Sequence, residues 1–115
     1  MRVITEVSAT RDQRNLEIEE NIAASVEEAL DDLLGTPVVE AFYAYLLEIG
    51  VSRNNLADKV KLLCSALDST FEESSLTIQR AIAQRLFAKL GMPFTPVESI
   101  SLLEYIKIAR KQKRV

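Results

Sequence analysis

The chain has 115 residues, enough for one domain, and its 48% hydrophobic and 27% charged residues are typical of a folded globular protein rather than a disordered one. It has no histidine and one cysteine, which excludes imidazole-based catalysis, zinc sites that mix cysteine with histidine, and an intrachain disulfide. The net charge of −3 is unevenly spread: residues 1–60 hold twelve acids and five bases, and residues 61–115 hold five acids and nine bases.

Helical periodicity starts at about residue 15. Residues 1–14 show weak alternation at best, and they are predicted to be disordered, an added helical turn or a short strand. The first helix is predicted over about 15–34, because apolar residues recur at helical spacing up to Leu33. Gly35 is predicted to end it, since glycine enters the left-handed cap without strain.

The second helix is predicted over about 36–49. Thr36 can cap it and Pro37 suits its first position, where a missing N–H costs nothing. Gly50 ends the pattern. Because this helix is apolar on most of its circumference, we expect it at the centre of the fold.

The third and fourth helices are predicted on either side of a polar break at 68–70. Asn55 is the expected cap of the third helix. Thr70 and Glu73 have the capping-box spacing that predicts the start of the fourth helix, which Gly91 ends.

The fifth helix is predicted over about 96–112. Thr95, Pro96 and Glu98 combine a cap, a first-position proline and a capping-box glutamate. The chain is therefore predicted to be all-α: one domain over residues 15–115, built as a bundle of about five helices with short loops marked by glycine and proline.

The motifs of common enzyme classes are absent from this sequence. No glycine-rich phosphate loop, EF-hand loop or Ser-x-x-Lys motif occurs. Cys64 lies in an apolar run and is expected to be a buried, inert thiol rather than a reactive one. We expect no cofactor and no enzymatic activity.

An acidic cluster lies on the predicted first helix. Glu27 and Asp31, and likewise Glu28 and Asp32, are four residues apart, so each pair faces one side of the helix and repels. The cluster is interpreted as a solvated face, or as a surface for a basic partner, which could be the C-terminus of a second copy. A divalent-cation site would need further oxygen ligands from another helix.

A basic stripe lies on the predicted fifth helix, with its apolar residues Leu102, Tyr105, Ile106 and Ala109 on the opposite side. Its cations can offset the helix dipole, bind nucleic acid, or meet an acidic protein or an anionic membrane surface. The candidate patch, including three bases of the fourth helix, comprises Arg80, Arg85, Lys89, Lys107, Arg110, Lys111 and Arg114.

Three aromatic residues of the second helix are the candidate interface. Phe42, Tyr43 and Tyr45 span more than half of one turn, so they do not easily face one core together. We expect one of them, Tyr43, to be exposed at an interface. The alternative is that a fully surrounded helix buries all three.

The middle of the chain resembles a small archaeal helical family. The residues that carry the resemblance are Leu33-Leu34-Gly35, Ala41 to Glu48, Gly50-Val51, Ala66-Leu67, Phe71, Ile78, Ile82, Leu86 and Leu90-Gly91. These residues are similar to the output domains of Nitrosopumilus-type signalling proteins over roughly 28–91, although Glu72 stands where that family often has glycine. The resemblance implies an archaeal signalling or regulatory module and assigns no catalytic residue.

The predicted function is a non-enzymatic helical interaction module with a signalling or regulatory role, which binds a protein partner or itself. No run approaches the roughly 18 apolar residues that span a membrane, and the N-terminus has no signal-peptide core, so we expect a cytoplasmic protein. The alternative is a DNA-binding regulator that uses the basic C-terminal helix.

Overall fold

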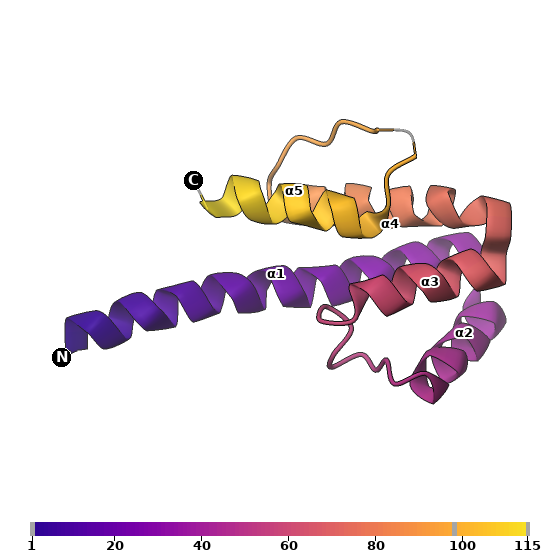
Figure 1. Ribbon diagram of the computed structural model, residues 1–115, viewed down its shortest axis with the longest axis horizontal. Helices are drawn as coiled ribbons and strands as arrows, with labels where there is room; N and C mark the ends of the chain where they lie inside the picture. Colours follow the sequence, from indigo (N-terminus) through magenta and orange to yellow (C-terminus); the bar gives the residue numbers. More distant parts are fainter. Residues whose placement is uncertain (1, 98, 115) are drawn as a thin grey trace.

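A computed structural model describes the backbone of residues 2–97 and 99–114, and the side chains of residues 17–97 and 99–112. The helices in chain order are α1 (Arg2–Leu34), α2 (Thr36–Glu48), α3 (Val60–Phe71), the short 3-10 helix η1 (Glu72–Ser74), α4 (Ser75–Lys89) and α5 (Leu102–Arg114). Figure 1 shows their arrangement. The predicted all-α, single-domain fold is confirmed.

The longest helix, α1, starts well before the predicted start at residue 15. It has 33 residues, and at about 1.5 Å per residue it accounts for the 50 Å long axis of the molecule. Its N-terminal part extends beyond the other helices (Figure 1). From Ile18 onward it buries one stripe that continues through Ile22, Val26 and Leu30.

The centre of the fold is formed by α1 and α4, which pack along each other. Asp32 of α1 pairs with Arg85 of α4, and Glu28 pairs with Lys89. Residue numbers fall along α1 as they rise along α4, so the two helices are antiparallel. Helices α3 and α5 also pack on α4, whereas α2 packs mainly on α1. The prediction that α2 is central is therefore wrong: it lies at the periphery (Figure 1) and buries only Val39, Phe42 and Leu46.

The junction between α1 and α2 is a glycine turn. Gly35 ends α1 as predicted, with a φ of 80° that strains any other residue. Gly35 is also the residue before α2, and its carbonyl accepts the Val39 N–H at 3.1 Å. Thr36 belongs to the helix and its side chain makes no cap hydrogen bond, contrary to the predicted cap.

Asn55 holds a loop rather than capping α3. Its Oδ1 accepts the Ser52 N–H at 2.7 Å, and its Nδ2 donates to the Gly50 carbonyl at 3.2 Å. Helix α3 begins only at Val60. The predicted cap was wrong because the side chain bonds back toward α2 instead of forward into α3.

The break between α3 and α4 also differs from prediction. Helix α3 continues through 68–70 to Phe71, and the chain turns at Glu72, which has a φ of 49°. The predicted Thr70 cap is absent, and Asp68 of α3 instead bonds directly to α4. Its Oδ1 accepts the Ser75 hydroxyl at 2.6 Å and the Gln79 amide at 3.2 Å.

The start of α5 lies later than the proline signal predicted. Residues 92–97 and 99–101 lie outside the helices, and Ser101 Oγ accepts the Glu104 N–H at 3.3 Å, in the first turn of α5. The Tyr105 hydroxyl donates to the Val97 carbonyl at 2.9 Å and accepts its N–H at 2.8 Å. The predicted cap residue Glu98 lies outside the described residues.

Candidate functional site

The outer side of α2 carries large apolar side chains in contact with solvent. Val38 is 44% exposed, Tyr45 38% and Leu47 65%, although the inner side of the same helix is buried. An all-round apolar helix at the edge of a fold must leave such residues exposed, and this is the reason for the surface.

Between α2 and the end of α3 lies a hollow that we call the α2–α3 groove. Its base includes Phe42 and Phe71, whose ring centroids are 5.4 Å apart. Phe42 is buried and Phe71 half-buried, so the two rings join the groove to the core. The lining residues are Val38, Ala41, Phe42, Tyr45, Ser69, Thr70 and Phe71.

The three candidate aromatic residues of α2 have three different environments. Phe42 is buried, Tyr43 is half-buried and Tyr45 is exposed. The exposed ring is therefore Tyr45 rather than the expected Tyr43, and the alternative that all three are buried is also wrong. The Arg53 guanidinium lies 5.6 Å from the centroid of the Tyr43 ring and covers it.

The ionisation of Tyr43 reflects this half-buried position. Burial raises the pKa of the Tyr43 phenol, Arg53 lowers it, and Glu27 and Asp31 raise it further. The neutral phenol is thus favoured in the folded state. The contribution of Tyr43 to stability is expected to be lost as pH rises past the ordinary tyrosine pKa.

Most of the predicted acidic face is paired within the chain. Glu27 pairs with Arg53 at 3.1 Å and Glu28 with Lys89 at 2.6 Å. Asp32 pairs with Arg85. These pairs are largely exposed and each adds little stability, but they reduce the charge that this face offers to a partner. Asp31 is exposed, and no group of three or more metal-ligating side chains occurs among the described residues.

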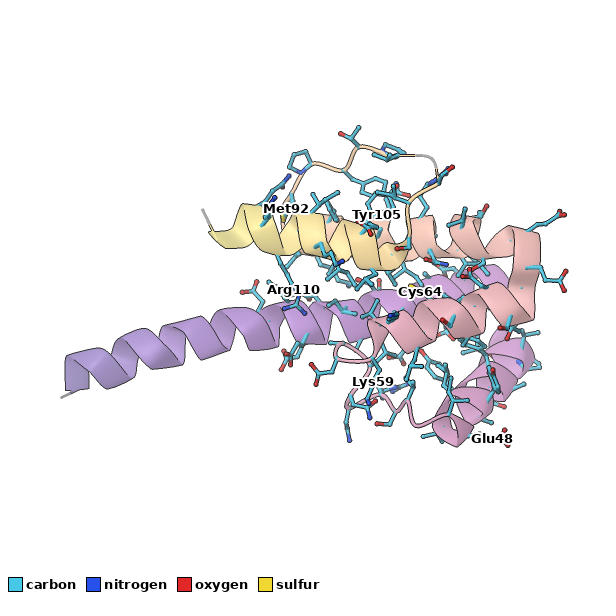
Figure 2. The ribbon with its side chains drawn as sticks, in the orientation of Figure 1. Glu48, Lys59, Cys64, Met92, Tyr105 and Arg110 are labelled. Carbon is cyan, nitrogen blue, oxygen red and sulfur yellow. The ribbon has the colours of Figure 1, made fainter. Side chains whose placement is uncertain are left out.

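The predicted basic patch is divided by the same ion pairs. Arg85 and Lys89 are engaged with α1. Lys107 and Lys111 are exposed on α5, whereas Arg80 and Arg110 are half-buried. Figure 2 shows Arg110 directed from α5 toward α1. Arg114 belongs to α5, but its side chain lies outside the described residues.

The parts of the chain that form the α2–α3 groove contain acidic residues but no basic ones. No lysine or arginine occurs within residues 15–52 or 62–79, which include all of α2, η1 and the end of α3. Glu48 follows Tyr45 by one helical turn, and Glu72 and Glu73 follow Phe71 directly. We call Glu48, Glu72 and Glu73 the groove carboxylates; all three are exposed, and none forms an ion pair with a described residue.

Helix dipoles add to this negative field. The last turns of α2 and α3 both contain no basic residue. The C-terminus of a helix carries a partial negative charge, which a lysine or arginine normally offsets. Since Ser69, Thr70 and Phe71 line the groove, the C-terminus of α3 opens onto it.

Sequence reasoning missed the α3 side of the groove. Thr70 was interpreted as a cap and Phe71 as part of the next helix, so neither was placed beside α2. The exposure of Val38 was missed because α2 was expected at the centre. The absence of a polar face on α2 was the available signal, since such a helix is either enclosed or presents apolar surface.

Cys64 is a buried free thiol, as predicted, and lies between α3 and α5 (Figure 2). Burial raises the pKa of the Cys64 thiol, although backbone contacts with Leu103 lower it in part. We expect iodoacetamide at mildly alkaline pH to alkylate the folded chain at least about a hundredfold more slowly than the urea-unfolded chain. Equal rates would show that the thiol is accessible.

Comparisons with family models, with curated proteins and with solved structures find no match for this chain. The resemblance to the archaeal signalling family therefore stays a prediction. No helix among the described residues combines the length and apolar character that crossing a membrane requires.

Proposed function

We propose that this chain is a non-enzymatic interaction module with a signalling or regulatory role, and that it binds a protein partner through the α2–α3 groove. The observation that carries the proposal is the exposure of Val38 and Tyr45 beside the Phe42–Phe71 pair. The resemblance to an archaeal signalling family supports the regulatory role.

Exposed apolar residues that adjoin one another are typical of a binding surface, whereas scattered ones are not. Val38, Ala41 and Tyr45 recur at helical spacing along one side of α2 and border the same hollow. Tyrosine is among the residues that most often dominate binding energy, because it buries a large rigid ring and keeps a polar end. The groove therefore has the composition of an interface centre.

The positions of the lysine and arginine side chains favour docking of a protein over DNA binding. Two of the seven residues in the predicted basic patch, Arg85 and Lys89, pair with α1, and two more are half-buried. The exposed lysines of α5 suit solubility and the helix dipole equally well. The groove has no comparable structural explanation.

Site-specific photocrosslinking tests the proposal. A benzophenone amino acid is placed at Tyr45 and, as control, at the exposed position Gln84 on α4. We expect a discrete protein adduct in cells from position 45 and none from position 84. The adduct should disappear when Val38→Ser is added, since that change removes an anchor contact but no core residue. Equal adducts from both positions, or an adduct that persists with Val38→Ser, would contradict the proposal.

A further inference from the structure

We infer that the segment that occupies the α2–α3 groove is a basic amphipathic helix of a partner protein. This inference rests on the proposed function and adds the chemical class of the partner. It is carried by an exposed apolar groove that lies beside carboxylates that form no ion pair with any described residue.

The shape of the groove suits a helix. It lies between α2 and the end of α3, and both elements supply its lining residues. A helix that docks into such a surface uses apolar side chains at positions i, i+3 or i+4, and i+7, which meet one continuous stripe. Val38, Ala41 and Tyr45 present a stripe with this spacing from the groove side.

The negative charge around the groove favours a partner segment that carries positive charge. The groove carboxylates lack ion-pair partners among the described residues, and the C-terminus of α3, which opens onto the groove, adds negative potential. Figure 2 shows Glu48 at the outer end of α2. Lysine and arginine on the flanks of a docked helix would lie opposite these carboxylates, which favours association and its rate.

A second copy of this chain is a poorer occupant. Symmetric pairing of two grooves would bring Glu48, Glu72 and Glu73 of one copy toward the same carboxylates of the other. The basic helix of a second copy, α5, has its apolar side buried in its own fold, where Leu102, Tyr105 and Ile106 are all nearly inaccessible. Its exposed side offers lysines and a single exposed large apolar residue among those described, Ile108.

Two designed peptides of about 18 residues serve as probes, long enough to form a helix on binding. Both carry leucine at helical spacing; one has lysine at the remaining positions and the other has glutamate. Binding to the full chain is measured by fluorescence anisotropy. We expect micromolar binding of the leucine–lysine peptide and at least about tenfold weaker binding of the leucine–glutamate peptide, because repulsion replaces attraction.

Variants of the chain separate the two parts of the inference. The triple variant Glu48→Gln, Glu72→Gln, Glu73→Gln is expected to weaken the leucine–lysine peptide about tenfold, since three exposed ion pairs are lost. The matched control Glu17→Gln, Glu20→Gln, Glu104→Gln changes the net charge equally at exposed positions on α1 and α5 and should weaken it less than about threefold. Val38→Ser with Tyr45→Ser should abolish binding.

Each alternative outcome has a distinct meaning. Equal binding of both peptides, lost with the two serine changes, would overturn the basic partner but leave the groove as a docking site. Binding of the lysine peptide that the serine changes do not weaken, or no binding of that peptide, would overturn this inference, and the crosslink from position 45 then decides separately whether the groove binds a protein. A chain that dimerises alone in sedimentation, and becomes monomeric with Tyr45→Ser, would assign the groove to a second copy and overturn the inference.

Discussion

Replacement of Gln79 by alanine is expected to lower the free energy of unfolding by about 3 kcal/mol. Gln79 is 1% exposed and its amide connects three helices. Nε2 donates to Ser75 Oγ at 2.8 Å and to Asp68 Oδ1 at 3.2 Å, and Oε1 accepts the Leu102 N–H at 2.8 Å. Alanine leaves a cavity, and it leaves the buried Leu102 N–H at the start of α5 without a hydrogen-bond acceptor.

The control for this change is Gln84→Ala on the same helix, where the glutamine is exposed. It should change stability by less than about 0.5 kcal/mol. Urea unfolding followed by circular dichroism measures both. If the two variants lose equal stability, the Gln79 amide does not hold α3, α4 and α5 together.

The second large effect is expected at Phe42. Phe42→Ala should lower the free energy of unfolding by about 3–4 kcal/mol, because the ring is 3% exposed and lies 5.4 Å from the Phe71 ring. Tyr45→Ala, three residues along the same helix, should cost less than about 1 kcal/mol, since that ring is 38% exposed.

For binding of the leucine–lysine peptide, we expect the change at Tyr45 to have a large effect although its effect on stability is small. Tyr45→Ala is expected to keep the fold and lose most of the binding, because its ring borders the groove. Denaturant unfolding and anisotropy on the same samples give both quantities. A Tyr45→Ala variant that unfolds as readily as Phe42→Ala would show that the outer side of α2 is part of the core.

The inward-facing residues of the helices were largely predictable from sequence. The apolar spacing that predicts the first helix includes Ile22, Val26 and Leu30, which are buried, and Leu33, which is 49% exposed. The same holds for the inner side of α5, where Leu102, Tyr105 and Ile106 were predicted opposite the basic stripe. Periodicity succeeds here because burial of one stripe is the main source of stability for each helix.

The helix boundaries were harder to predict, because several local capping patterns compete. Contacts with residues distant in the sequence determine which of them forms. Thr95 to Glu98 has a strong start signal, yet α5 starts after Ser101, whose own spacing to Glu104 is a capping box. Tyr105 holds the loop at Val97, and Gln79 accepts the Leu102 N–H. No local pattern contains these contacts, since Gln79 is 23 residues from Leu102.

The charge of the candidate site was only partly predictable. The acidic character of residues 15–52 is visible in the sequence, but the pairing of its members is not. Asp32 meets a base 53 residues away and Glu28 one 61 residues away. Folding therefore neutralises part of the predicted acidic face, whereas the groove carboxylates form no ion pair with the residues that the structure describes.

The most direct test of the groove as a docking site for a basic helix is amide chemical-shift mapping. The isotope-labelled full chain is titrated with the leucine–lysine peptide, and shifts are followed residue by residue. The structure predicts that the largest shifts fall within residues 38–48 and 69–73, with little change along α5. Shifts spread evenly over the acidic residues of α1, or concentrated away from α2 and α3, would contradict the groove as the binding site.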